Sequence, residues 1–228
     1  MKAIGSISAL ALLTFAATSR AATSYNDPGG VGDFTGGSGF MDISSVTVDN
    51  DANNLIFTIN LGGDPTTASW ANYLVGIVHP AMNASGGNLN GPGGWGTDIQ
   101  MSVGGMDYFI GAYPYWGSSQ ILTWNGASWI TASGNASGET TSSASFTVPL
   151  AALGLSAGNT IHFDVWSQSS GNSVLDALSD GVARSWNNNP FDTGQNALSY
   201  TVVPEPGICA MLGLGSLLLI RRVRSGKR

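Results

Sequence analysis

The chain has 228 residues, of which 43% are apolar and only 10% are charged, and glycine alone accounts for 32 of them. So little charge with so much glycine favours an all-β domain with many turns over a helical protein. Residues 22–206 contain all 14 acidic residues but a single basic one, Arg184, so this segment carries a formal charge of −13. That charge excludes nucleic acid and anionic lipid as partners of the segment, and it suits a divalent cation or a neutral ligand.

The first segment, residues 1–21, has the pattern of a secretory signal peptide. Lys2 supplies a positive start, and residues 9–17 form a short apolar run. Ser19 and Ala21 then place small residues at the −3 and −1 positions of a cleavage site. The apolar run is too short for a lasting anchor, so we expect an exported mature protein without this segment.

The middle segment, residues 22–202, has the pattern of an antiparallel β-sandwich ectodomain. Residues 54–61 carry apolar side chains at every second position, which is the period of a half-buried strand. Residues 70–79 are mostly apolar, which predicts a central strand. Many short strands separated by turn signals favour a sandwich. The expected strands cover residues 42–49, 54–61, 70–79, 98–103, 106–113, 120–124, 128–131, 143–148, 160–168 and 198–202, with one helical turn at 149–155.

Two local patterns refine this expectation. Asn125 and Gly126 predict a two-residue hairpin turn, because Asn-Gly supplies both positive φ values of a type I′ turn. In the strand at 160–168, His162, Asp164 and Trp166 alternate with apolar residues, so we expect these three to point away from the core. The chain lacks the G-x-S-x-G motif beside this His and Asp, and we expect no catalytic residues.

The C-terminal tail, residues 203–228, combines three features in a fixed order. A Pro204-Glu205-Pro206 triplet is followed by an apolar helix at 207–220 and a basic end at 221–228. The apolar part is short against a hydrocarbon core of about 30 Å, and the basic end should remain in the cytoplasm. We therefore expect the tail to hold the protein in the inner membrane only transiently.

This triplet, helix and basic end resemble the PEP-CTERM sorting signal of certain Gram-negative bacteria. The resemblance implies that Pro204, Glu205 and Pro206 are recognised by an exosortase, a membrane protease-transpeptidase that processes such tails. It also implies an organism that makes exopolysaccharide. The expected destination is the cell surface or the extracellular matrix.

Several stretches of the middle segment are familiar together, and they lie at residues 26–33, 70–77, 105–111, 152–166 and 175–180. They resemble the DOMON-like sandwiches of the glucodextranase C-terminal and carbohydrate-binding type. The resemblance covers most of the ectodomain and implies a jelly-roll type of sandwich. It also implies sugar binding, haem binding in some branches, and packing stabilised by calcium.

Asp27 and Asp33 flank a loop of proline and glycine near the start of the ectodomain. Calcium takes several oxygen ligands around a flexible backbone, and such a loop supplies carboxylates and carbonyls. The family resemblance points to the same loop, with Asp176 as a weaker third candidate. The alternative is a solvated loop whose Asp residues bond their own backbone. A second acidic stretch, residues 49–53, lacks the glycine and glutamate of an EF-hand and predicts a hairpin turn.

Five aromatic residues lie close together in the sequence around loops and the predicted hairpin, and they are Tyr113, Tyr115, Trp116, Trp124 and Trp129. Aromatic faces stack on the apolar C–H groups of sugar rings, so these residues are candidates for a glycan-binding face. The alternative is that the rings pack in the core or across strands.

The one cysteine, Cys209, lies in the tail, which leaves the ectodomain without a disulfide or a thiolate metal site. We expect no cofactor other than calcium. The sequence thus predicts a non-enzymatic exported protein that binds extracellular polysaccharide. An extracellular polysaccharide hydrolase and a purely structural adhesin remain as alternatives.

Overall fold

A computed structural model describes residues 22–79, 86–96, 98–133, 136–169, 174–186 and 190–204. The expected signal peptide and the tail from residue 205 onward lie outside the described residues. Those between 22 and 204 form one compact unit. Within this part of the chain, no helix has the length and apolar character needed to cross a membrane.

The first sheet has five strands, all of them antiparallel to their neighbours. In sheet order they are β1 (Thr23–Asn26), β2 (Ile43–Asn50), β3 (Asn54–Leu61), β10 (Ser143–Pro149) and β9 (Ala136–Glu139). The strand predicted at 54–61 is confirmed with its bounds, and Leu55, Phe57 and Ile59 are its buried positions. Phe57 pairs with Val48 on one side and with Phe146 on the other.

The second sheet has seven antiparallel strands. Its path runs β12 (Val174–Ala177), β11 (Thr160–Gln168), β4 (Asn72–Val78), β6 (Tyr108–Tyr113), β7 (Ser118–Trp124) and β8 (Trp129–Ser133), and β14 (Leu198–Thr201) also pairs with β11. The central strand expected from the apolar run is confirmed, because β4 is buried along its whole length between β11 and β6. The strand predicted at 160–168 is confirmed with its bounds.

The remaining elements are short. β5 (Ile99–Gln100) and β13 (Phe191–Asp192) form a two-stranded parallel pair. The described helices are 3-10 turns of at most four residues, namely η1 (Gly39–Met41), η2 (Pro65–Thr67), η4 (Pro114–Trp116), η5 (Leu150–Leu153) and η6 (Gly194–Asn196). The all-β class with antiparallel sheets is thereby confirmed.

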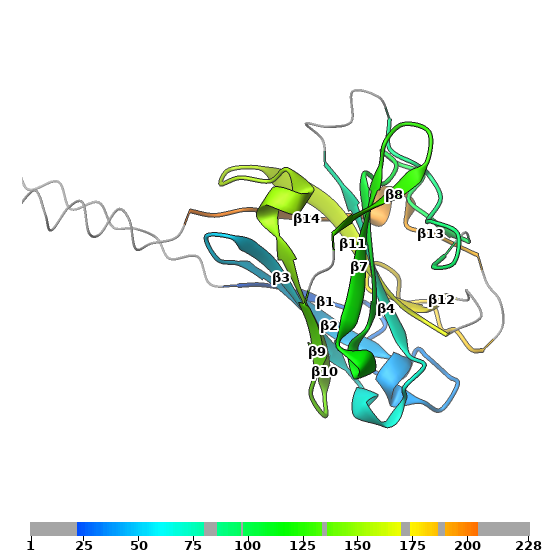
Figure 1. The fold of residues 1–228 in the computed structure, drawn as a ribbon. Helices are drawn as coiled ribbons and strands as arrows, with labels where there is room; N and C mark the ends of the chain where they lie inside the picture. The colour runs from blue at the N-terminus through cyan, green and yellow to red at the C-terminus, as the bar shows by residue number, and fades with distance from the viewer. Residues whose placement is uncertain are drawn as a thin grey trace, which may run out of the picture. The chain divides into compact units, whose positions relative to one another are not determined.

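The two large sheets pack face to face around one shared core (Figure 1). Val48, Phe57 and Phe146 of the first sheet meet Ile77 and Phe163 of the second sheet in this core. The ring centroids of Phe57 and Phe163 lie 5.6 Å apart across the interface. Because alternate residues of each strand point inward, burial of this apolar face is what holds the two layers together.

The outer face of the seven-stranded sheet is also covered, which corrects one expectation. His162 is exposed as expected, but Asp164 and Trp166 are fully buried in a second apolar cluster with Phe109, Val174 and others. Asp164 keeps its charge buried by accepting hydrogen bonds at 2.6 Å from the hydroxyls of Ser179 and Thr193. Period two predicted the shared face of the three residues, but it carries no information on the loops that cover that face.

Several element bounds differ from the predicted ones. The strand expected at 98–103 is only two residues long, and β1, β9, β12 and β13 were not predicted. The predicted two-residue hairpin is wrong, because Trp124 pairs with Trp129 and leaves a four-residue loop. The side chain of Asn125 stabilises this longer loop by accepting hydrogen bonds from the amides of Ala127 and Ser128.

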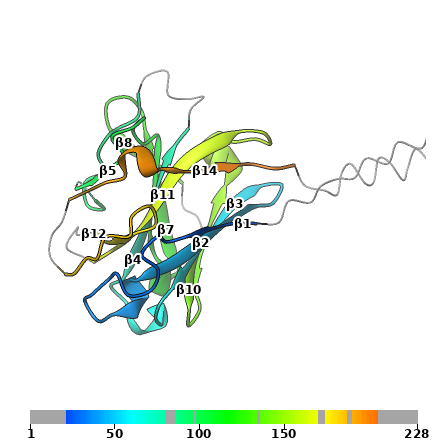
Figure 2. The same cartoon turned by 180° about the vertical axis from the view of Figure 1, so that it is seen from behind.

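Both ends of the described unit lie beside the β2–β3 turn. The carboxamide of Asn50 donates to the carbonyl of Val203 and accepts from its amide, both at 2.9 Å, and it also accepts from the hydroxyl of Tyr200 at 2.8 Å. Thr23 at the start of β1 pairs with Val48, close to the same turn. Figure 2 shows β1 and β14 running to this common end of the molecule.

Replacement of Asn50 by Ala should detach the last described residues from the β2–β3 turn. Loss of its hydrogen bonds to Tyr200 and Val203 should lower the free energy of unfolding by about 1–3 kcal/mol. Asn53→Ala, an exposed position in the same turn, is the matched control and should change stability by less than about 0.5 kcal/mol. Thermal or urea unfolding of both variants measures the difference, and equal stability would contradict the assigned contacts.

Candidate metal centre

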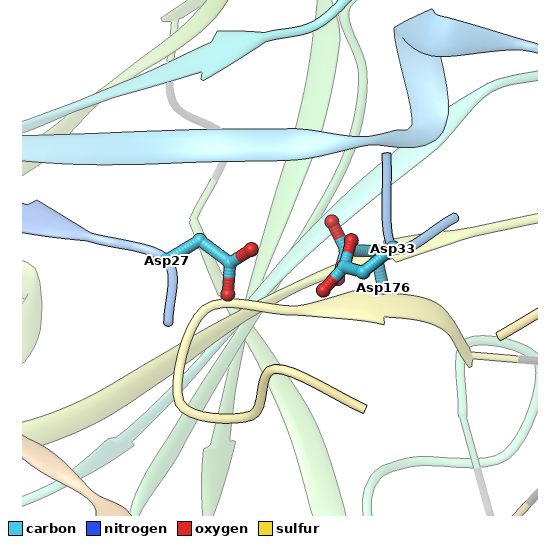
Figure 3. A group of neighbouring side chains, drawn as sticks. All are labelled: Asp27, Asp33 and Asp176. Atoms are coloured by element: carbon cyan, nitrogen blue, oxygen red, sulfur yellow. The ribbon is translucent and has the colours of Figure 1, made fainter. Parts of the chain in front are cut away.

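The structure brings together the three aspartates that the sequence singled out as metal ligands. Asp27 directly follows β1, Asp33 lies in the glycine-rich loop and Asp176 lies on β12. All three residues are buried, and one carboxylate oxygen from each lies within 4.8 Å of the others. In Figure 3 the carboxylate of Asp27 faces those of Asp33 and Asp176 across a small gap.

Local backbone geometry explains how the loop delivers two of these carboxylates. The amide of Gly30 donates to the carbonyl of Asp27 at 3.2 Å, which closes a turn at the start of the loop. Gly29 then lies directly against Asp33, and a Cβ at Gly29 would sit 2.1 Å from an oxygen of that carboxylate. Only glycine allows this close approach.

Asp176 comes from the second sheet and connects it to the first. Its carboxylate accepts hydrogen bonds from the amide of Ile43, at the start of β2, and from the amide of Ala177. The hydroxyl of Ser167 on β11 donates to the carbonyl of Met41 next to the same junction. The acidic cluster therefore lies where the two sheets join at one end of the fold.

A fourth carboxylate, Asp42, borders the cluster. It is 3% exposed, and one of its oxygens accepts a hydrogen bond from the amide of Gly32 at 2.7 Å. Its other oxygen is buried and has no hydrogen-bond partner. Sequence reasoning missed Asp42 because it took this residue as the first position of a strand, and the only available signal was an acidic residue at the entry to an apolar strand.

None of the four carboxylate oxygens of Asp27 and Asp33 accepts a well-formed hydrogen bond, although all four are buried. The amides of Gly29 and Gly30 lower the pKa of Asp27 and the amide of Phe34 lowers that of Asp33, but burial outweighs these weak contacts. A buried carboxylate without a donor or a counter-charge is costly, so it takes up a proton or binds a cation. The ion pair that the structure describes, Arg184 with Asp180 at 2.6 Å, engages the one basic residue of the ectodomain elsewhere. The cluster thus has the charge that a cation would neutralise.

The pKa values of the cluster respond to this environment. Burial raises the pKa of Asp27, and the negative charge of Asp33 raises it further. Burial and the neighbouring Asp42 likewise raise the pKa of Asp33. Burial raises the pKa of Asp176 to about 8, against the opposing effect of the hydrogen bond from Ile43. Without a cation, these groups take up protons near neutral pH.

The donor set is chemically specific. It consists of carboxylate oxygens next to a flexible loop that also carries backbone carbonyls, which are the ligands that hard cations such as calcium use. No histidine or cysteine belongs to the cluster among the described residues, so it lacks the ligands that zinc and copper prefer.

The five predicted glycan-binding aromatics do not form one surface. Tyr113 ends β6, and Tyr115 and Trp116 lie on η4 before β7. Trp124 and Trp129 lie at the opposite end of β7, about 20 Å away along the strand. The five aromatics were grouped by their nearness in sequence, and β7 separates them into two groups in space. Glycan binding by these residues stays a prediction.

The two groups also differ in exposure. Tyr115 and Trp116 are exposed, with ring centroids 5.0 Å apart. Trp124 and Trp129 are half-buried and pack on each other across the hairpin at 5.6 Å, and Trp129 also contacts Phe109 of the second apolar cluster. The cross-strand alternative therefore describes this second group.

Two further sequence motifs are the sorting triplet and the acidic stretch at residues 49–53. Pro204 is exposed at the end of the described unit, while Glu205 and Pro206 lie outside the described residues. The acidic stretch at 49–53 is a hairpin turn as predicted, in which Asp51 accepts hydrogen bonds from the amides of Asn53 and Asn54.

Comparison with known proteins adds no family, because no family model matches the chain and no curated protein matches it.

The raised pKa values predict how the stability of the metal-free protein depends on pH. Each protonated carboxyl favours the folded state, because its folded pKa lies above its unfolded value near 4. That stability is complete below pH 4 and is lost as the pH rises through the folded values. Protein stripped of metal should therefore melt at least about 5 °C lower at pH 8 than at pH 5.

Two variants make this measurement specific. Asp176→Asn should reduce the loss of stability between pH 5 and pH 8, because the amide has no proton to release. Asp98→Asn removes a partly exposed carboxylate outside the cluster and should leave the pH profile unchanged. Equal melting temperatures at both pH values in the stripped wild type would contradict the assigned pKa shifts.

Proposed function

We propose that this chain is an exported, non-enzymatic protein of the cell surface or extracellular matrix. Its ectodomain is a β-sandwich of the DOMON-like type that binds a cation, most suitably calcium, and extracellular polysaccharide. The observation that carries the cation site is the buried cluster of Asp27, Asp33 and Asp176, in which two carboxylates accept no well-formed hydrogen bond.

Calcium fits the cluster better than a smaller ion. Asp27, Asp33, Asp176 and the unpartnered oxygen of Asp42 supply oxygen ligands, and the glycine-rich loop can adjust to six to eight of them. Because the cluster is buried at the junction of the sheets, the ion would stabilise the fold rather than meet a substrate. An extracellular location, where calcium is abundant, agrees with this role.

A binding role is favoured over catalysis by the contacts of the most promising polar residues. Asp164 accepts hydrogen bonds from Ser179 and Thr193 in a fully buried setting, which supports a structural function. His162 is exposed on the same strand, whereas Asp164 is fully buried. The abundance of aromatic side chains with a strongly negative surface favours a neutral polysaccharide as ligand.

The sorting proposal rests on the tail. Pro204 and Pro206 lack amide hydrogens and bias the residues before them toward extended backbone, which presents Glu205 in an open segment. An exosortase-type membrane enzyme would read this segment and release the ectodomain outward. Asn50 anchors Val203 to the fold, so the cleavage segment begins directly after a fixed point.

Retention on polysaccharides tests the binding function. Exported protein recovered from cells should be retarded in native gels that contain a neutral polysaccharide, and it should leave the polymer intact. New reducing ends would instead indicate the hydrolase alternative. Protein that neither retards nor cleaves would fit the adhesin alternative and would refute the proposed binding function.

Replacement of the Pro204-Glu205-Pro206 triplet by three alanines tests the sorting function. The signal peptide should still be removed, but the ectodomain should stay at the inner membrane with its basic tail attached. Cell fractionation with an antibody against the ectodomain measures this. Equal amounts of tail-less protein outside the cell from both forms would show that the triplet is only a linker.

A further inference from the structure

The exposed aromatic residues of the described chain gather at one end of the molecule. Trp70, Tyr115, Trp116 and Trp186 are 38%, 45%, 66% and 45% exposed, and the other described aromatic side chains are buried or half-buried. Trp70 precedes β4, η4 carries Tyr115 and Trp116, and Trp186 follows the segment that pairs with Phe34. None of these positions belongs to a strand.

Four of the rings at this end form a continuous row. The ring centroids of Phe34 and Trp186 lie 5.1 Å apart, those of Trp186 and Trp70 lie 5.5 Å apart, and those of Trp70 and Phe40 lie 5.4 Å apart. Trp116 joins the row because its indole nitrogen donates to the carbonyl of Ser69, next to Trp70. We call Phe34, Phe40, Trp70, Trp116 and Trp186 the aromatic ridge.

Two of the three indole rings of the ridge, those of Trp116 and Trp186, are held in place by hydrogen bonds from their ring nitrogens. Trp186 donates to the carbonyl of Gly36 and Trp116 donates to the carbonyl of Ser69, each at 2.9 Å. The fit is close at Gly36, where a Cβ would lie 2.2 Å from the ring of Phe34 and 2.6 Å from the indole nitrogen of Trp186. Fixed rings with satisfied N–H groups offer mainly their apolar faces, and binding costs them little conformational entropy.

The charges around the ridge favour a neutral ligand. Arg184 is the one basic residue of the ectodomain, and it lies two residues from Trp186. Its guanidinium is already paired with Asp180 at 2.6 Å and stacks on the ring of Phe191 at 4.7 Å. No other cation is present between residues 22 and 204 to pair with the carboxylates of an acidic polymer. Neutral sugar rings have apolar C–H faces that match the indole faces without needing a counter-charge.

The ridge and the acidic cluster share one segment, residues 27–41. This segment carries Asp27 and Asp33, and it then supplies the ring of Phe34, the carbonyl of Gly36 and the ring of Phe40. It contains six glycines, so its backbone has little intrinsic preference for this conformation.

The connection between the two sites is direct. The carbonyl of Asp33 accepts the amide of Arg184 at 2.7 Å, and the carbonyl of Arg184 accepts the amide of Thr35 at the same distance. A cation bound to Asp33 would therefore also hold the pairing of Phe34 with Arg184. This pairing lies next to Gly36 and Trp186, which are themselves joined by a hydrogen bond.

The ridge also lies at the accessible end of the fold. β2 begins next to the acidic cluster and ends at Asn50, which holds Val203 near the start of the tail. Eight residues of strand span about 26 Å at 3.3 Å per residue. The ridge therefore lies at the end of the described unit remote from Val203.

We propose that the aromatic ridge is the binding site for a neutral polysaccharide, and that the cation at the acidic cluster keeps the ridge assembled. This inference rests on the proposed function and adds the location and the metal dependence of binding. The rings of Trp70, Trp116 and Trp186 stack on successive sugar units, while Phe34 and Phe40 support them from below the surface.

The test is affinity electrophoresis of the exported protein. Native gels contain a soluble α-glucan, a β-glucan, a xylan or a galactomannan, with alginate as the acidic comparison, and each is run in calcium or in EDTA. Trp70→Ala and Trp186→Ala should each weaken retention by a neutral polymer about tenfold. Trp124→Ala removes a half-buried ring at the other end of β7 and should bind as the wild type does.

Two further variants separate loss of binding from loss of stability and test the metal dependence. Trp116→Ala removes the most exposed ring, so it should weaken binding without changing the melting temperature even if Trp70→Ala lowers stability. Asp33→Asn in calcium should lose retention to the same extent as the wild type in EDTA. Equal retention in calcium and EDTA would overturn the metal dependence.

The outcomes separate this inference from the proposed function. Failure of the wild type to be retained by any neutral polysaccharide would refute the proposed function itself. Retention that survives in the Trp70→Ala, Trp116→Ala and Trp186→Ala variants would refute the ridge as the site while leaving polysaccharide binding intact. Preferential retention by alginate would assign the ridge to an acidic polymer and overturn the inference. Self-association in sedimentation would do the same if Trp70→Ala abolished it, because the ridge would then bind a second copy of the chain.

Discussion

Buried negative charge at the junction of the two sheets is the constraint on which the rest of this structure depends. Asp27 and Asp33 come from the first sheet and its loop, and Asp176 comes from the second. Their mutual repulsion therefore opposes the packing of the layers unless the carboxyls take up protons or bind a cation. No basic side chain meets these carboxylates among the described residues. On our proposal, a cation supplies that charge at neutral pH and turns the repulsion into a connection between the sheets.

The described unit has two distinct ends. At one end, Asn50 fixes the last described residues to the β2–β3 turn, and β1 begins nearby. At the other end, the acidic cluster and the aromatic ridge share residues 27–41. The shared apolar core and the second cluster around Trp166 fill the space on both faces of the seven-stranded sheet between these ends. The exposed aromatic rings therefore lie at the end of the described unit opposite to Val203.

The sequence predicted those parts of the fold that local periodicity determines. β3 and β11 were placed with their bounds because alternation of apolar residues over eight or nine positions is a strong signal. β1, β9 and β12 have four residues each and are too short for such a signal. Burial of Asp164 was missed because it depends on loops that fold back over the sheet. Asp27, Asp33 and Asp176 were predicted as metal ligands from loop composition and a family resemblance. Asp42 beside them, and Trp70 and Trp186 in the aromatic ridge, were not predicted, because only the folded chain brings their loops together.

A calorimetric titration of the metal-free protein with calcium at pH 7.5 decides whether the acidic cluster binds a cation. We expect saturable binding of one ion per chain in the wild type and in Asp98→Asn. We expect loss of that binding in Asp33→Asn, because the carboxylate that links the cluster to the Arg184 segment is neutralised. Absence of saturable binding up to millimolar calcium in the wild type, or unchanged binding in Asp33→Asn, would contradict the claim that a cation holds the two sheets together.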